Sequence, residues 1–122
     1  MFDHVTLRVK DLGKAKRFYS EALAPLGYRT LYESKESVGL GDGKEPTLWI
    51  AQDSPVTAAI HLAFTSPDHK KVDAFHAAGL GSGGRDNGKP GPRPDYGPDY
   101  YAAFVHDPDG NNIEAVCNKP VR

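Results

Sequence analysis

The sequence predicts an α+β fold made of two similar halves, each with the order strand, helix and three further strands. The first observation is a repeat at an offset of 57 residues, which relates His4 to His61, Asp11 to Asp68 and Phe18 to Phe75. The second is the alternation of polar and apolar residues over 3–9, which is typical of a half-buried strand. The third is an apolar residue at every third or fourth position in the next segment, which indicates an amphipathic helix. A fixed offset that carries both elements indicates a duplicated unit.

The first half begins with the alternating segment and continues into a helix. His4, Thr6 and Arg8 face one side of the strand, and Val5, Leu7 and Val9 face the other. Asp11 is suited to cap the helix that follows, because an aspartate side chain accepts hydrogen bonds from the first free N–H groups. The apolar face of this helix consists of Leu12, Ala15, Phe18, Tyr19, Ala22 and Leu23. We then expect short strands over 28–34, 37–41 and 47–52, and a boundary between the halves near residue 55.

The second half repeats this order from about residue 56. We expect a strand over 58–65, with His61 facing away from Ile60 and Leu62, and a helix that begins at Ser66-Pro67-Asp68 and ends at Gly79. Its buried stripe is expected to be Val72, Phe75, His76 and Leu80. A strand over 100–106, the turn 107–110 and a strand over 112–117 should then form a hairpin with Glu114 in its middle.

Residues 79–99 differ from the rest of the chain in composition. Glycine and proline occupy 11 of these 21 positions. Such a connection in a compact domain is usually a functional loop or a disordered one. We therefore predict a largely irregular segment with one irregular strand near 85–88.

The bulk properties limit the classes of function. A chain of 122 residues fits one domain. It has 15 basic and 16 acidic residues, a net charge of −1, so there is no electrostatic reason to expect binding to nucleic acid or to an anionic membrane. The first strand begins within two residues of Met1, which leaves no room for a signal peptide, and Cys117 is the single cysteine. We expect a protein of the reducing cytoplasm.

Three residues with metal-ligand chemistry lie in the middle of expected strands: His4, His61 and Glu114. Two histidines and one carboxylate are a common ligand set for divalent metals. A single histidine on a strand is more often an ordinary core or surface residue. The duplication favours the metal site, because equivalent positions in two halves can meet across a pseudo-twofold axis.

The same segments carry a resemblance to a known family. Residues 4–12 followed by Phe18-Tyr19, residues 61–64, and residues 107–114 resemble the vicinal oxygen chelate superfamily, which includes glyoxalases, extradiol dioxygenases and the bleomycin and fosfomycin resistance proteins. The chain is similar to a glyoxalase-like single-domain member. The resemblance implies two βαβββ modules that form a cup-shaped, half-open eight-stranded barrel with helices outside. It also implies a divalent metal (Zn, Ni, Mn, Fe or Co) and a homodimer.

The resemblance also implies roles for individual residues. Ligands in this superfamily come from the first and fourth strands of each module, so His4, His61 and Glu114 match three of four positions, and Glu114 is also the expected catalytic residue. The fourth position falls on Trp49 or Ile50, neither of which binds metal, with Gln52 the nearby polar side chain. This departs from the glyoxalase pattern and agrees better with the three-ligand dioxygenases and thiol transferases. The chain is shorter than typical extradiol dioxygenases, which argues against that reaction.

Two functions are compatible with this resemblance. One is a metal-dependent enzyme, a lyase or isomerase or a dioxygenase-like enzyme, that chelates a small oxygen-bearing substrate. The alternative is a non-catalytic protein that sequesters a small molecule, as bleomycin resistance proteins do; three ligand-type residues argue against it. Candidate substrate contacts are Arg8, Trp49, Arg93, Tyr96 and Tyr100. Arg8 is equally suited to pair with an acidic neighbour at the rim, and the glycines of 84–99 either form a lid over the cup or only span a distance.

Overall fold

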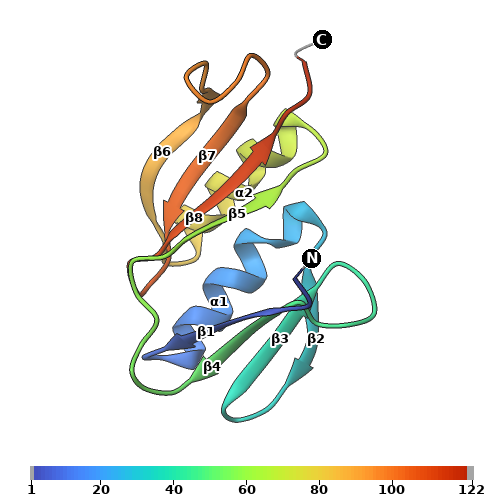
Figure 1. Cartoon of the computed structure of the whole chain (residues 1–122). Helices are drawn as coiled ribbons and strands as arrows, with labels where there is room; N and C mark the ends of the chain where they lie inside the picture. The colour runs from blue at the N-terminus through green and yellow to red at the C-terminus, as the bar shows by residue number, and fades with distance from the viewer. Residues whose placement is uncertain (1, 121–122) are drawn as a thin grey trace.

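Two four-stranded mixed sheets, one from each half of the chain, form the framework (Figure 1). The structure is a computed structural model and describes residues 2–120. The strands of the first sheet, in spatial order, are β1 (Val5–Val9), β4 (Leu48–Gln52), β3 (Ser37–Gly41) and β2 (Arg29–Glu33). Those of the second are β5 (His61–Thr65), β8 (Asn112–Cys117), β7 (Tyr101–His106) and β6 (Arg85–Pro92). The predicted order of elements in each half and the α+β class are confirmed.

Within residues 2–120 each half has one α-helix, and the two begin in the same way. The helix α1 (Leu12–Ala22) follows β1, and α2 (His69–Gly81) follows β5. Asp11 accepts a hydrogen bond from the Lys14 backbone N–H at 3.1 Å, and Asp68 accepts one from the Lys71 N–H at 2.7 Å. Both caps satisfy amide groups that would otherwise have no partner at a helix start. A short 3-10 helix, η1 (Ala24–Leu26), ends at Gly27, which has a positive φ of 92°.

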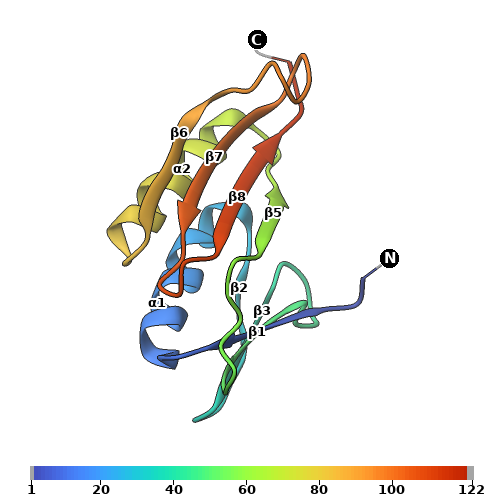
Figure 2. The same ribbon diagram turned by 60° about the vertical axis from the view of Figure 1, so that its left-hand side comes forward.

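The helices cover the same side of the two sheets, and the core lies between them (Figure 2). In β1, Leu7 and Val9 are each 1% exposed, whereas Thr6 and Arg8 are exposed on the other face. The predicted register of this strand is therefore confirmed. The core joins both halves and includes Leu7, Phe18, Leu40, Ile50, Phe75 and Ile113.

Two local predictions about the second half are wrong. The strand β5 begins at His61 and not at residue 58, because Ala59 has a positive φ of 60° and the Ile60 N–H bonds to the Asn111 side chain. In α2, Leu80 is 40% exposed and Gly79 takes the buried position. A Cβ at Gly79 would lie 3.3 Å from both methyl carbons of Val105, so the helix and the sheet approach closely there.

The glycine- and proline-rich segment is more regular than predicted. Residues 85–92 form the strand β6, which pairs with β7 and shifts its register on both sides of Gly88. It is an edge strand, and edge strands tolerate proline because one row of their N–H groups needs no partner. Residues 93–100 are left as the connection between β6 and β7.

The sheets meet without closing into a barrel, which is consistent with a cup. Over residues 2–120, β1 pairs with β4 alone and β5 with β8 alone, so each strand has one free edge. A hollow of about 350 Å³ between them is lined by residues that include Phe2, His4, Leu62 and Phe64. In the same range, no helix is long and apolar enough to cross a membrane.

Candidate functional site

His61 and Glu114 face each other on the side of the second sheet that is turned away from the helices. Neighbouring parallel strands carry them, and Glu114 stands in register with Ala63, two residues after His61. The His61 Nε2 and Glu114 Oε1 atoms are 2.6 Å apart. The Glu114 side chain is 1% exposed, whereas that of His61 is 54% exposed. A buried carboxylate is thus in contact with an imidazole that is accessible to solvent.

Tyr100 contacts the second oxygen of the Glu114 carboxylate. Its hydroxyl donates a hydrogen bond to Glu114 Oε2. Burial, followed by this hydrogen bond and the charge of Glu114, raises the pKa of Tyr100 to about 12. Tyr100 is therefore protonated near neutral pH and is a hydrogen-bond donor to Glu114.

Aromatic rings lie beside this pair, and three predicted substrate contacts, Arg93, Tyr96 and Tyr100, are found with them. Tyr96 packs edge-on against Tyr100 with ring centroids 5.3 Å apart. Arg93 lies over the ring of Phe104, 5.4 Å from its centroid, and its guanidinium donates to the carbonyls of Lys89, Gly91 and Pro92. Those bonds hold Arg93 within the end of the β6–β7 hairpin. A substrate role for Arg93, Tyr96 and Tyr100 stays a prediction.

Phe104 is a site residue that the sequence analysis missed. Its ring centroid is 6.1 Å from that of His61, and its Cα pairs with that of Glu114. The predicted hairpin of β7 and β8 could have identified it. With the turn fixed at 107–111, counting back along the strand places Phe104 directly opposite Glu114.

His4 lies apart from this pair. Its Nδ1 is 2.7 Å from the Asp3 carboxylate, and its side chain is 51% exposed next to the first sheet. No group of three His, Cys, Asp or Glu side chains within residues 2–120 is arranged to hold a metal ion. His4 precedes β1 of the first sheet, whereas His61 and Glu114 lie on β5 and β8 of the second, so the described residues of one chain do not bring the three together. Their roles as metal ligands stay a prediction.

The fourth ligand position of the resemblance holds no metal donor. Trp49 lies on the exposed face, close over Gly39 and 5.3 Å from the Tyr32 ring, while Ile50 is fully buried in the core. The Gln52 Oε1 atom accepts a hydrogen bond from the Leu12 N–H at 2.8 Å, so this side chain is used at the start of α1.

Arg8 shares the exposed face of the first sheet with Trp49. The Arg8 N–H donates a hydrogen bond to the Thr57 hydroxyl, and the Arg8 carbonyl accepts one from the Thr57 N–H. Thr57 follows the boundary between the halves. The Arg8 guanidinium forms no ion pair within residues 2–120. The alternative of an Arg8 ion pair at the rim therefore has no support in this chain, and substrate contact stays a prediction for both Arg8 and Trp49.

A buried polar network supports the strand that carries His61. The Asp107 carboxylate accepts hydrogen bonds from the Tyr19 hydroxyl and from the Asn111 amide. Asn111 in turn holds Thr57 and Ile60, next to His61. Burial and the neighbouring Asp107 raise the pKa of Tyr19 well above its usual value. The sequence analysis had identified only a turn at these positions.

The comparisons with known proteins agree with this fold. The sequence profile of the Glyoxalase/Bleomycin resistance protein/Dioxygenase superfamily matches residues 1–115. The chain belongs to this superfamily. A protein named probable lactoylglutathione lyase from Vibrio parahaemolyticus is 35% identical over an alignment of 130 residues, which covers 95% of this chain and 89% of that protein.

Solved structures of the superfamily match over nearly the whole chain. A glyoxalase/bleomycin resistance protein from Albidiferax ferrireducens superposes with a TM-score of 0.84 at 34% identity, covering 98% of this chain and 99% of the other. A mutant of glyoxalase I from Zea mays gives a TM-score of 0.70 at 28% identity, covering 94% of this chain and 45% of that one.

His61 and Glu114 carry the kinds of donor atom that bind divalent metals. One imidazole nitrogen and one carboxylate oxygen, at His61 and Glu114, already point at each other. Both are donors that Zn, Fe, Ni, Co and Mn accept. A catalytic zinc site usually has three protein ligands, so a metal at this pair would need a further donor.

Proposed function

We propose that this protein is a glyoxalase-like metalloenzyme that works as a homodimer. A divalent metal would be held by His61 and Glu114 of one copy and by His4 of the other. The observation that supports this most strongly is the contact between an accessible histidine and a carboxylate that is only 1% exposed. A buried carboxylate is costly unless it is paired, so such pairs mark candidate functional sites.

A second copy is the natural source of the third ligand. His4 belongs to a half whose sheet ends at the free edge of β1, and the sheet with His61 ends at the free edge of β5. Phe2 is 91% exposed and, with His4, lines the hollow between these edges. An exposed phenylalanine beside unpaired strand edges favours association with another chain.

The residues of the chain define the chemistry available to such a site. A bound divalent ion would supply Lewis-acid stabilisation of negative charge that develops on a substrate oxygen. Glu114 is positioned to accept a proton at Oε1 once a substrate displaces His61 from that oxygen. Tyr100 holds the carboxylate in one orientation, and the surrounding side chains leave Glu114 only 1% exposed to water.

A lyase or isomerase reaction on a small oxygen-bearing substrate is the activity that we favour. The Vibrio relative named as a lactoylglutathione lyase supports this class. Arg8 and Trp49 from one half, and Arg93, Tyr96 and Tyr100 from the other, would contact the substrate. Formation of lactoylglutathione is the first reaction to assay on metal-loaded protein, followed by a broader substrate screen.

The second candidate function is sequestration of a small molecule without chemistry. One observation favours it: Trp49 and Tyr32 form an aromatic surface at the fourth ligand position, where a glyoxalase has a further ligand. Stacking surfaces suit a binder of flat aromatic molecules.

Metal analysis separates the two functions. Protein purified without chelator should contain close to one metal ion per chain, or recover it on addition of Mn, Fe, Co, Ni or Zn. The variants His61→Ala and Glu114→Gln should each lose about 100-fold or more in metal affinity, since each removes a direct ligand. Wild-type affinity in both variants, or protein that binds none of these metals, would exclude the metalloenzyme and leave the sequestering protein.

A further inference from the structure

A second hollow of about 500 Å³ lies away from the His61–Glu114 pair, at the junction of α1, the start of β6 and the β7–β8 turn. Its volume falls within the range of small-molecule sites. The cationic side chains that line it are Lys14, Arg17 and Arg85. Its remaining lining residues are Ser82, Gly83, Asp107 and Pro108. None of these residues belongs to the proposed metal site.

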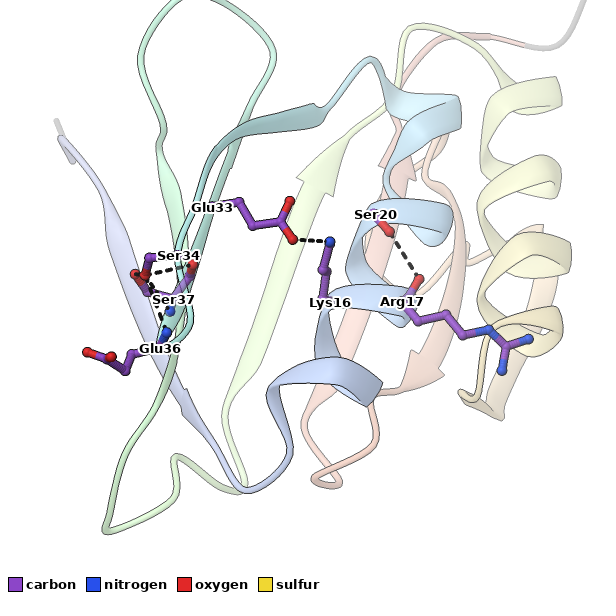
Figure 3. A network of polar contacts seen from close by, with 7 residues as sticks. All are labelled: Lys16, Arg17, Ser20, Glu33, Ser34, Glu36 and Ser37. Carbon is purple, nitrogen blue, oxygen red and sulfur yellow. Dashed lines mark hydrogen bonds and ion pairs between the residues drawn. The ribbon is translucent and has the colours of Figure 1, made fainter.

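The Arg17 guanidinium is held at this hollow by the protein itself. Its Nη2 atom donates to the Gly81 carbonyl at 2.9 Å, and its Nε atom donates to Glu21 at 3.3 Å. Figure 3 shows Arg17 reaching from α1 toward α2, whereas Lys16 of the same helix turns to Glu33. A guanidinium held in this way loses little conformational freedom when it binds a ligand.

The other two cations have no acidic partner. Neither Lys14 nor Arg85 forms an ion pair within residues 2–120, and both are exposed. The chain as a whole has a net charge of −1, so this local excess of positive charge is not a consequence of composition. Like charges gathered around a concave surface attract an anion.

Asp107 is the one acidic residue that lines this hollow in the described part of the chain, and its carboxylate is already engaged. Its Oδ1 accepts the backbone N–H groups of Asp109 and Asn111 at 2.9 and 2.8 Å. Its Oδ2 accepts from the Asn111 amide at 3.0 Å and from the Tyr19 hydroxyl. Asp107 is 2% exposed and forms no ion pair with Lys14, Arg17 or Arg85 within residues 2–120.

We propose that this hollow binds a small polyvalent oxyanion, a molecule with phosphate or carboxylate groups. Arg85 offers the forked donors that match two oxygens of such a group, Arg17 adds the N–H donors that its bonds to Gly81 and Glu21 leave free, and Lys14 adds a point charge. The two sites share no residue, so an anion bound here would not need the metal ligands.

The test is calorimetric titration of the full-length protein with pyrophosphate and, separately, with citrate at low ionic strength. Binding of pyrophosphate alone assigns a phosphate ligand, binding of citrate alone a carboxylate ligand, and both results support the site. Lys14→Ala and Arg85→Ala should each weaken binding about tenfold, the loss expected for one charge-assisted hydrogen bond. Lys35→Ala, which removes an exposed cation outside the hollow, should not change the affinity.

Glu114→Gln provides the second control. This variant disables the proposed metal site, so pyrophosphate should bind it as it binds the wild type. Loss of binding in Glu114→Gln would show that pyrophosphate is bound at the metal site, which would overturn the proposal. Absence of binding by both anions, or equal affinity in wild type, Lys14→Ala and Arg85→Ala, would overturn it as well.

Discussion

Glu114 is a buried carboxylate whose two oxygens have different partners. His61 contacts one oxygen and Tyr100 donates to the other. The first partner is accessible and belongs to the proposed ligand set, whereas the second fixes the orientation of the carboxylate. We therefore expect the Oε1 atom of Glu114 to exchange His61 for a metal or a substrate, and the Oε2 atom to keep Tyr100.

Tyr100→Phe tests this division. Removal of the hydroxyl leaves Glu114 Oε2 without its donor, so we expect the free energy of unfolding to fall by about 1–3 kcal/mol. Metal affinity should fall about tenfold, as for other groups that orient a ligand. Chemical denaturation and metal titration measure the two effects.

Tyr96→Phe is the matched control for that prediction. Tyr96 is 67% exposed and contacts Tyr100 through its ring. Loss of its hydroxyl should leave unfolding and metal affinity within about 0.5 kcal/mol of wild type. Equal effects in the two variants would contradict an orienting role for Tyr100.

At the scale of helices and strands, the packing of α2 on the second sheet requires a glycine at position 84, between α2 and β6. A Cβ at Gly84 would come within 2.5 Å of both Phe18 and Val105, whereas one at Gly81 would meet nothing within 4 Å. The same tight packing places Gly79 in the core and leaves Leu80 exposed. The apolar spacing of α2 alone could not reveal this, because it depends on the distance to Val105 in β7.

The two glycines should therefore respond differently to alanine. Gly84→Ala should lower the free energy of unfolding by about 2 kcal/mol or more, because the rigid neighbours must move. Gly81→Ala should change it by less than about 1 kcal/mol, and a gain is expected from the lower entropy of the unfolded chain. Thermal or denaturant unfolding measures both, and equal losses would contradict the close approach at Gly84.

Tyr101 links β7 to α2 and supplies a prediction about pH. Its hydrogen bond to Asp73, followed by burial, raises the pKa of Tyr101 to about 12. Because this value exceeds that of an unfolded tyrosine, near 10, the stability from this group is complete below pH 10 and lost as the pH rises to 12. The difference in unfolding free energy between wild type and Tyr101→Phe should shrink across this range. If denaturation experiments from pH 9 to 12 gave a constant difference in unfolding free energy between wild type and Tyr101→Phe, the stabilising Tyr101–Asp73 hydrogen bond would be refuted.

At the scale of the whole molecule, local patterns predicted most of the fold. The alternation in β1 and the cap Asp11 depend on neighbours in sequence, and both are confirmed. Asp68 caps α2 at the position that the 57-residue repeat relates to Asp11. The strand β6 was not predicted over its full length, because proline and glycine are tolerated there only through its position at a sheet edge. The separation of His4 from His61 follows from how the two halves pack, which no local pattern encodes.

The placement of the two halves leads to a prediction about assembly. The free edges of β1 and β5, together with the exposed Phe2, favour a homodimer. Light scattering should give about twice the chain mass of 13.2 kDa. A monomer mass at micromolar concentration, with metal bound, would contradict a site shared between copies.

The most direct measurement is metal binding by a mixture of two defective variants. His4→Ala and Glu114→Gln should each bind little metal alone. In a mixed dimer, the His4→Ala chain supplies His61 and Glu114 and the Glu114→Gln chain supplies His4, so one site is complete. After unfolding and refolding together, the mixture should recover about one quarter of the wild-type sites, because about half of the dimers are mixed and one of two sites in each is intact. Metal content in the mixture no higher than in the separate variants, with mixed dimers demonstrated by a mass tag, would contradict the shared site.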